Sequence, residues 1–309
     1  MNIPPLPRFQ TSTGVRVLIL LAMALVGVLV VGGVTFLLTL IAGSIDVESG
    51  PGMYAALLAQ DVLVFIVPAI VAMALCYHQP MRVMGFDRAP SWSSLLVVLA
   101  VCALSLPMMN WVVEWNKGLH LPDSLSHIED LLRLMEDMAE AATEELLGGT
   151  SVGVLLLNVL VVGVMAGVSE ETFFRGGLMR MLTAGRCNVH VAVWVVAMVF
   201  SAIHFQFFGF VPRMLLGAWL GYLLVRTGSL WVPIIAHALN NSLVVVVSWL
   251  ENRELVSTNS LDSLGVPKHG EFPWLALASA IATIAIIVLW MRRKKQILAA
   301  LPENTIPTP

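Results

Sequence analysis

Long apolar runs separated by short polar segments dominate this sequence. A transmembrane α-helix needs about 20 consecutive apolar residues, and runs of that length recur from one end of the chain to the other. Gly and Pro mark the shortest connections, near 209–212 and 228–233, which indicates tight helical hairpins there. The pattern predicts an all-α polytopic membrane protein with about eight transmembrane helices, over 17–42, 53–77, 93–115, 152–174, 190–210, 212–227, 230–250 and 272–291.

Composition supports this assignment and excludes one class of partner. Hydrophobic residues make up 58% of the 309 residues and charged residues only 12%, whereas about a quarter of an ordinary soluble domain is charged. The expected surroundings are therefore the lipid bilayer. A formal net charge of -3 provides no basic field for a nucleic-acid backbone, so we expect no nucleic-acid partner.

The basic residues of the loops predict the orientation. Eight spans place both termini on one side, and Lys and Arg are retained on the cytoplasmic side. Both termini should be cytoplasmic, in the plasma membrane if the protein is bacterial. The expected organisation is a cytoplasmic segment 1–16, a transmembrane domain 17–291 and a basic, disordered tail 292–309. That side carries eleven basic residues, Arg8, Arg16, Arg82, Arg88, Arg180, Arg186, Arg226, Arg292, Arg293, Lys294 and Lys295, against five on the other, Lys117, Arg133, Arg213, Arg253 and Lys268.

The polar insert between the third and fourth spans has helical periodicity. We expect an amphipathic helix over about 124–146 on the outer face of the membrane, with a mainly acidic polar side. Ser126 and Glu129 have the spacing of a capping box at its start. Its apolar stripe is Leu125, Ile128, Leu131, Leu132, Met135, Met138 and Ala142.

One group of charged residues lies inside a predicted span. A charge at the centre of a bilayer costs at least about 2.5 to 3.5 kcal/mol, so Glu170, Glu171 and Arg175 need an explanation. The two carboxylates point about 100° apart on a helix. Arg175 follows Glu171 by four residues, the spacing of an intrahelical ion pair. We therefore expect Glu171 and Arg175 to neutralise each other and Glu170 to be free for chemistry, although an ion-pair pin between helices is the structural alternative.

Two further spans contribute polar groups at similar depth. His204 lies about 20 Å along its span, and His237 and Asn241, four residues apart, share a helix face. A lone histidine in a membrane usually joins two helices by a hydrogen bond. Polar groups from three spans indicate a site instead. Asp61 and Arg213 are expected nearer the outer ends of their spans, where they could pair with each other, outside the site.

These residue types suit the hydrolysis of an acyl bond. A carboxylate with an imidazole can activate water, and an imidazole with an amide can hold an oxyanion. Ser169, Ser201 and Ser242 have no nucleophile-elbow context, which argues against a serine hydrolase. Zinc held by Glu170, His204 and His237, with Glu171 as base, stays open, although the usual His-Glu-x-x-His helix is missing.

The three motifs together resemble the CAAX prenyl protease 2-like intramembrane peptidases, the CPBP or Abi family. Glu170, Glu171 and Arg175 match its Glu-Glu-x-x-x-Arg pattern. Phe200 with His204 matches Phe-x-x-x-His, and His237 with Asn241 matches His-x-x-x-Asn. The family core would cover about 150–250.

The resemblance implies an eight-span fold with an intramembrane cavity, open to peptides or proteins from the membrane or the cytoplasmic face. It implies that Glu170 and His204 activate water, that His237 and Asn241 hold the oxyanion, and that Glu171 and Arg175 support them. No cofactor is then required, with zinc as the alternative. Substrates would be membrane-associated or lipidated, processed as CAAX proteins or as bacterial peptides. A non-catalytic immunity or scaffold protein and a proton-coupled transporter are the rival classes.

Overall fold

A computed structural model describes residues 11–42, 50–185, 187–257, 263–267 and 271–299. These residues form helices and turns, and no β-strand occurs among them. Contacts divide the chain into two compact units, 1–90 with 115–258 and 91–114 with 259–309. Seven helices in the described part of the chain are long and apolar enough to cross a membrane, and an eighth apolar helix is shorter. The predicted all-helical polytopic fold is confirmed.

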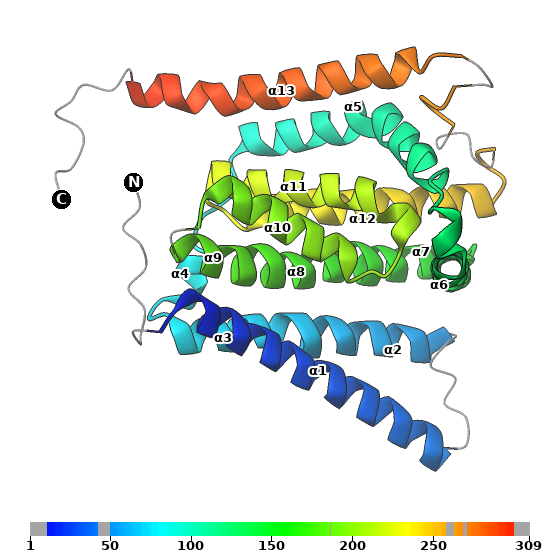
Figure 1. The fold of residues 1–309 in the computed structure, drawn as a ribbon, viewed down its shortest axis with the longest axis horizontal. Helices are drawn as coiled ribbons and strands as arrows, with labels where there is room; N and C mark the ends of the chain where they lie inside the picture. Colours follow the sequence, from blue (N-terminus) through cyan, green and yellow to red (C-terminus); the bar gives the residue numbers. More distant parts are fainter. Residues whose placement is uncertain (1–10, 43–49, 186, 258–262, 268–270, 300–309) are drawn as a thin grey trace. The chain divides into compact units, whose positions relative to one another are not determined.

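The elements follow one another along the chain as Figure 1 shows. They are α1 (Thr13–Ala42), α2 (Gly50–Gln60), the π-helical segment η1 (Asp61–Ile66), α3 (Val67–Cys76), α4 (Pro80–Met84), α5 (Trp92–Lys117), the 3₁₀ turn η2 (Asp123–Leu125), α6 (Ser126–Leu147), α7 (Val152–Asn158), the π-helical η3 (Val159–Met165), α8 (Ala166–Glu171), the π-helical η4 (Thr172–Met179), α9 (Arg180–Ala184), α10 (Val189–Ala202), the 3₁₀ turn η5 (Phe207–Gly209), α11 (Phe210–Thr227), α12 (Trp231–Asn252) and α13 (Trp274–Ala299).

Small residues let the two central helices of the larger unit approach closely. A Cβ atom added to Gly163 would lie 2.3 Å from Ser242 Oγ, and one added to Gly167 would lie 2.9 Å from the Ala238 nitrogen. Glycines four residues apart thus face small residues four residues apart on α12, the arrangement that packs helices in membranes. The continuous helix from α7 to α9 is thereby held against α12.

The fifth span differs from its prediction. The sequence predicts a helix over 190–210, but α10 ends at Ala202. His204 and Phe205 continue in tight turns, with amides donating to carbonyls three residues back, and Phe205 has a φ of 54°. Ser201 Oγ donates to the Phe210 carbonyl at 2.7 Å across the turn. The helix therefore ends eight residues, or about two turns, before the end that the apolar pattern predicts, and His204 lies in the reversal.

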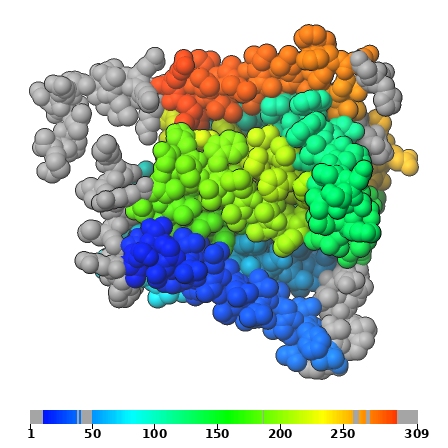
Figure 2. Space-filling model, in the orientation of Figure 1, coloured from blue at the N-terminus to red at the C-terminus, as the bar shows by residue number. Residues whose placement is uncertain are grey.

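Helix α6 lies where the amphipathic pattern places it, but its capping box does not form. No side chain caps its start. Glu129 instead accepts from the Leu121 amide at 2.7 Å and from Arg133 Nη2 at 2.6 Å. The capping prediction is wrong because these groups, outside the first turn, already occupy the carboxylate. The outward side of α6 forms part of the molecular surface in Figure 2, and its exposed apolar residues are Ile128, Leu131, Leu134 and Met138.

The smaller unit is built on α13 and most of α5. Ser279 Oγ donates to the Leu104 carbonyl and accepts from the Met108 amide at 3.2 Å. It therefore stands between two groups that would pair in a regular helix, next to Pro107, and α5 bends there (Figure 1). Helix α13 continues to Ala299, beyond the predicted end at 291, and residues 300–309 of the predicted tail lie outside the described residues.

Candidate active site

A fully buried ion pair forms the base of the polar cluster. Arg175 Nη1 lies 2.7 Å from Glu171 Oε1, and both side chains are 0% exposed. Arg175 Nη2 also donates to the Gly217 carbonyl on α11 at 2.8 Å, and the guanidinium stands over the Phe200 ring. The predicted pairing of these two charges is present. The same arginine also joins η4 to α10 and α11.

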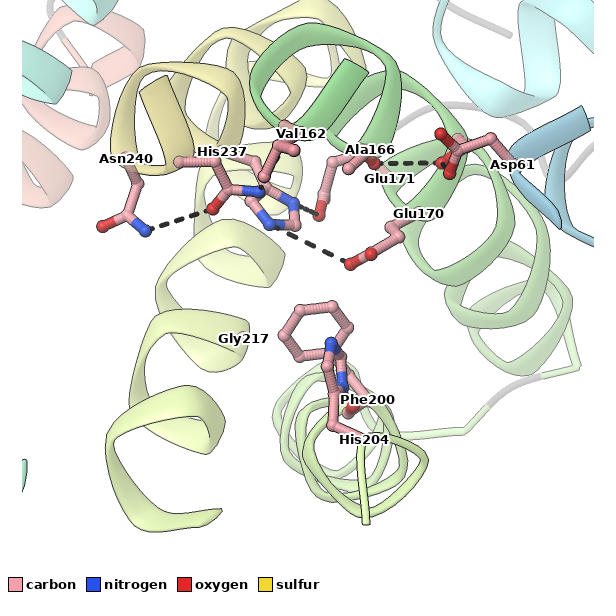
Figure 3. Close-up of polar contacts among 12 residues, drawn as sticks. Asp61, Val162, Ala166, Glu170, Glu171, Phe200, His204, Gly217, His237 and Asn240 are labelled. Carbon is pink, nitrogen blue, oxygen red and sulfur yellow. Dashed lines mark hydrogen bonds and ion pairs between the residues drawn. The ribbon is translucent and has the colours of Figure 1, made fainter. Parts of the chain in front are cut away.

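His237 connects the two adjacent carboxylates. Its Nδ1 is 3.0 Å from Glu171 Oε1, and its Nε2 is 3.9 Å from Glu170 Oε2 (Figure 3). A carboxylate accepts, so Nδ1 carries the proton of the first contact. Nε2 is then directed toward Glu170. The Glu170 side chain is 16% exposed, and its buried Oε2 has no hydrogen-bond partner.

His204 faces the same cluster across an aromatic ring. Its Nδ1 is 2.8 Å from the Phe200 carbonyl, which can only accept, so Nε2 is the free ring nitrogen. The Phe200 ring contacts both imidazoles, with centroid distances of 5.2 Å to His204 and 5.8 Å to His237. His204 and Glu170 form no hydrogen bond with each other in the described structure. The structure thus brings His204 beside the cluster, with no direct hydrogen bond to Glu170 (Figure 3).

Asn241 lies one turn beyond His237 on α12. Its Nδ2 donates to the Val162 carbonyl on η3 at 3.2 Å, and its Oδ1 accepts from Asn240 at 3.3 Å. An amide nitrogen has two N–H groups, so one of them is not used by the Val162 contact. The residue is partly buried. It is therefore held by η3 with one donor left for a ligand.

The structure places near the site one carboxylate, Asp61, that the sequence analysis expected outside it. Asp61, at the start of η1, is buried and accepts from Ser169 Oγ at 2.6 Å, directly beside Glu170 in the chain. Arg213 instead donates to Gln206 at 2.5 Å. The predicted pairing of Asp61 with Arg213 is wrong, because each has a nearer polar partner. The sequence held one clue to the contact with Ser169: a charged side chain inside a transmembrane span is expected to be buried against a polar partner.

The candidate metal donors do not converge on one point in the described residues. Zinc requires its ligand atoms to converge at about 2.0–2.3 Å around one point. No group of three or more His, Cys, Asp or Glu side chains in the described ranges is placed to do so. Each histidine has one nitrogen engaged, Nδ1 with Glu171 in His237 and Nδ1 with Phe200 in His204, and its Nε2 is free, which is also how a metal-binding histidine is held. In this structure Glu170, His204 and His237 are not gathered around one metal position.

Comparison with known proteins identifies one domain. Residues 152–243 match the family model described as type II CAAX prenyl endopeptidase Rce1-like. Curated proteins and solved structures give no significant match to the chain. The matched segment includes every residue of the cluster except Asp61, and it confirms the resemblance seen in the three motifs. The residues concerned are Glu170, Glu171, Arg175, His204, His237 and Asn241.

Proposed function

Because residues 152–243 carry the Rce1-like CAAX endopeptidase domain of a peptidase family, we propose that this protein is an intramembrane endopeptidase that hydrolyses peptide bonds with water activated by Glu170. The observation that carries the proposal is the contrast between its two adjacent carboxylates. Glu171 Oε1 bonds both Arg175 and His237, whereas neither oxygen of Glu170 accepts a hydrogen bond from the described residues; the Oε2 atom is buried without a partner in both side chains. An acid that lies within a membrane without a hydrogen-bond partner is a candidate for chemistry.

Glu170 is assigned the role of general base. It takes a proton from water as the water oxygen attacks the carbonyl carbon of the scissile bond. His204 assists, since its Nε2 is free to accept a hydrogen bond from the same water. When the carbon–nitrogen bond breaks, Glu170 returns the proton to the leaving amine, so that the enzyme regains its starting state.

His237 and Asn241 are assigned to the oxyanion of the tetrahedral intermediate. Donors fixed before the reaction stabilise developing charge most strongly where water is excluded. Glu171 fixes the His237 ring through Nδ1, and η3 fixes Asn241 through Val162. The remaining N–H group of Asn241 and a protonated Nε2 of His237 supply the two donors.

Charge balance supports this protonation state. With His237 doubly protonated, the four residues Glu170, Glu171, Arg175 and His237 carry two negative and two positive charges, which cancel; Asp61, held by Ser169, is not counted in this balance. A neutral cluster avoids the large cost of an uncompensated charge in a low-dielectric interior. Neither carboxylate then needs a metal ion to offset it.

The substrate is proposed as a peptide or protein that is membrane-associated or lipidated, reaching Glu170 from the membrane or the cytoplasmic face. Processing of CAAX proteins and processing of bacterial peptides both fit this class. Helices α8, α10 and α12, which surround the cluster, all belong to apolar segments of the membrane domain. A substrate must therefore bring its scissile bond to the bilayer.

The test is a cleavage assay on protein purified in detergent, with a mixed library of prenylated and unmodified peptides. We expect cleavage by the wild type, none by Glu170→Gln or His204→Ala, and wild-type cleavage by Glu144→Gln, a carboxylate exposed on α6. Cleavage should persist with a chelator. Restoration by zinc after chelation would replace the mechanism with a metal-dependent one. A folded Glu170→Gln variant that supports the cellular function of the wild type would favour the immunity or scaffold class.

A further inference from the structure

A cluster of arginines outside the peptidase site surrounds one glycine. It lies at the end of the larger unit where α4 and α9 meet the turn between α11 and α12. Arg180 Nη2 donates to the Gly228 carbonyl at 3.3 Å. A Cβ atom added to Gly228 would lie 2.2 Å from Arg88 Nη1, so the second guanidinium lies directly against the same residue. Gly228 has a φ of 70°, which suits glycine and leaves room for both.

The backbone around these arginines is firmly connected. The Leu230 amide donates to the Gly85 carbonyl at 3.0 Å, and Ser229 Oγ donates to the Arg88 carbonyl at 2.5 Å. Trp231 Nε1 donates to the Phe86 carbonyl at 3.0 Å. The segment after α4 is thus fixed to the start of α12. The two guanidiniums are held together by the fold, even though like charges repel.

Their positive charge is only partly offset. Asp87 is the acidic neighbour of Arg180, but it also pairs with Arg82 at 3.7 Å. Arg180 Nε is buried without a hydrogen-bond partner. The Arg88 guanidinium has no hydrogen bond or ion pair with the described residues. Three arginines with one carboxylate leave an excess of positive charge and several unused N–H donors.

A hollow of about 470 Å³ lies beside the arginines. Phe86 and Trp231 pack edge to face within its wall, with ring centroids 5.4 Å apart. Tryptophan gathers where apolar chains meet headgroups at the membrane interface. The hollow therefore has the character expected beneath a lipid headgroup. Its lining is Phe86, Asp87, Ala89, Pro90, Trp231 and Ile235.

We propose that Arg88 and Arg180 bind the phosphate of an anionic phospholipid, with the first part of the lipid chain in the hollow. Guanidinium groups bind phosphate through several parallel N–H donors. This end follows the second predicted span and precedes the third, which places it on the predicted cytoplasmic side, where anionic lipids concentrate. The apolar hollow selects a lipid over a free phosphate ion. This site does not depend on the proposed peptidase activity.

The experiment measures the unfolding temperature of the full chain in detergent as lipid is added. Phosphatidylglycerol should raise it in a saturable way, and phosphatidylcholine and inorganic phosphate should not. Arg88→Gln should need about tenfold more phosphatidylglycerol for the half-maximal shift, as expected when one charge-assisted contact is lost. Because Arg88 is exposed, this variant should fold.

Arg253→Gln is the matched control, since its guanidinium stacks on Trp249 at the other end of α12. It should respond to phosphatidylglycerol like the wild type. Native mass spectrometry should show a retained phosphatidylglycerol on the wild type and less on Arg88→Gln. Equal shifts with phosphatidylcholine, or an unchanged lipid requirement in Arg88→Gln, would overturn the site. A matching shift with inorganic phosphate alone would show a free anion site and overturn the lipid assignment.

Discussion

Glu170 and Glu171 are identical side chains with different surroundings. Glu171 is fully buried between Arg175 and His237. Glu170 is partly exposed and faces His237 at a distance too long for a hydrogen bond. The carboxylate with fixed partners holds the helices in register, and the carboxylate without them is available to water. Substitutions at these neighbouring positions should therefore fail in different ways.

Removing one partner of the buried pair should chiefly affect stability. Arg175→Gln leaves the buried charge of Glu171 with His237 as its remaining partner, and we expect a loss of about 3–5 kcal/mol in the free energy of unfolding. The double variant Glu171→Gln with Arg175→Met removes both charges and should recover part of that loss. Denaturant unfolding in detergent measures both. A single variant as stable as the wild type would show that the pair does not support the fold.

At the scale of elements, the turn that carries His204 depends on residues far away in the sequence. Asn116, at the end of α5, donates to the Phe207 carbonyl at 3.1 Å and accepts from the Val211 amide at 2.8 Å. Glu136 of α6 accepts from the Phe208 amide at 3.1 Å. Helix α6 is thereby joined to the reversal between α10 and α11.

Glu136→Ala should reduce cleavage by about tenfold to a hundredfold, because small displacements of a catalytic group are costly. Glu136→Gln retains an acceptor oxygen for the Phe208 amide and should restore most of the activity. Glu140→Ala, on the exposed side of the same helix, is the control and should cleave normally. The steady-state rate of peptide cleavage by each variant tests whether the contact of Glu136 with the turn supports catalysis. A Glu136→Ala enzyme with wild-type kinetics would separate α6 from the site.

Glycine-to-alanine substitutions should change stability in opposite directions at the contact between α8 and α12 and away from it. Alanine favours helix over glycine by about 1 kcal/mol, so Gly153→Ala, where no atom lies nearer than 3.8 Å, should be neutral or stabilising. Gly167→Ala should destabilise by about 1–3 kcal/mol through overpacking against Ala238. It should also reduce cleavage, because His237 is the next residue on α12. Thermal unfolding of the two variants tests this. An equal rise in the unfolding temperature of both would show that α8 and α12 are not closely packed at Gly167.

The start of α6 should respond to acid. The Leu121 amide, Arg133 and His120 lower the pKa of Glu129 from 4.5 to about 2. A lowered folded-state pKa means that Glu129 stabilises the fold above pH 4.5 and that this contribution is lost as the pH falls from 4.5 towards 2. Glu129→Gln should therefore be less stable than wild type at pH 7, and the difference between their unfolding midpoints should shrink steadily as the pH falls from 4.5 to about 2. Glu144→Gln should track the wild type throughout.

Apolar runs were enough to predict the helices, but not every helix end. The start of α12 lies within a residue of its prediction, because Gly228 and Pro233 are local signals in the sequence. The end of α10 is set by Asn116 and Ser201, which contact residues beyond the turn, and no local pattern reports that. Likewise the pairing of Glu171 with Arg175 follows from helical spacing, whereas the contact of Asp61 with Ser169 joins two spans. Long-range polar contacts of this kind determine the part of the site that sequence could not predict.

At the scale of the whole chain, the predicted location of both termini in the cytoplasm requires the chain to cross the membrane an even number of times. Helix α10 has 14 residues, about 21 Å at 1.5 Å per residue, which is shorter than the hydrocarbon core of about 30 Å. Its partner α11 nevertheless returns to the starting side, because Arg180, before α10, bonds to Gly228, after α11. Whether this hairpin crosses fully or partly, it adds no net crossing. The six other long helices, α1, α2–α3, α5, α7–α9, α12 and α13, keep the count even.

The start of α1 and the end of α13 should therefore lie on one side of the membrane, and the bias of basic residues predicts that this side is the cytoplasm. In a variant whose three native cysteines are replaced, Ser12→Cys and Gln296→Cys should be protected from an impermeant maleimide in intact cells, and Glu145→Cys, on α6, should be labelled. Labelling of Ser12→Cys but not Gln296→Cys would show an odd number of crossings. Labelling of both terminal positions with protection of Glu145→Cys would keep the even count but invert the orientation, and would move the arginine cluster at Gly228 to the outer leaflet.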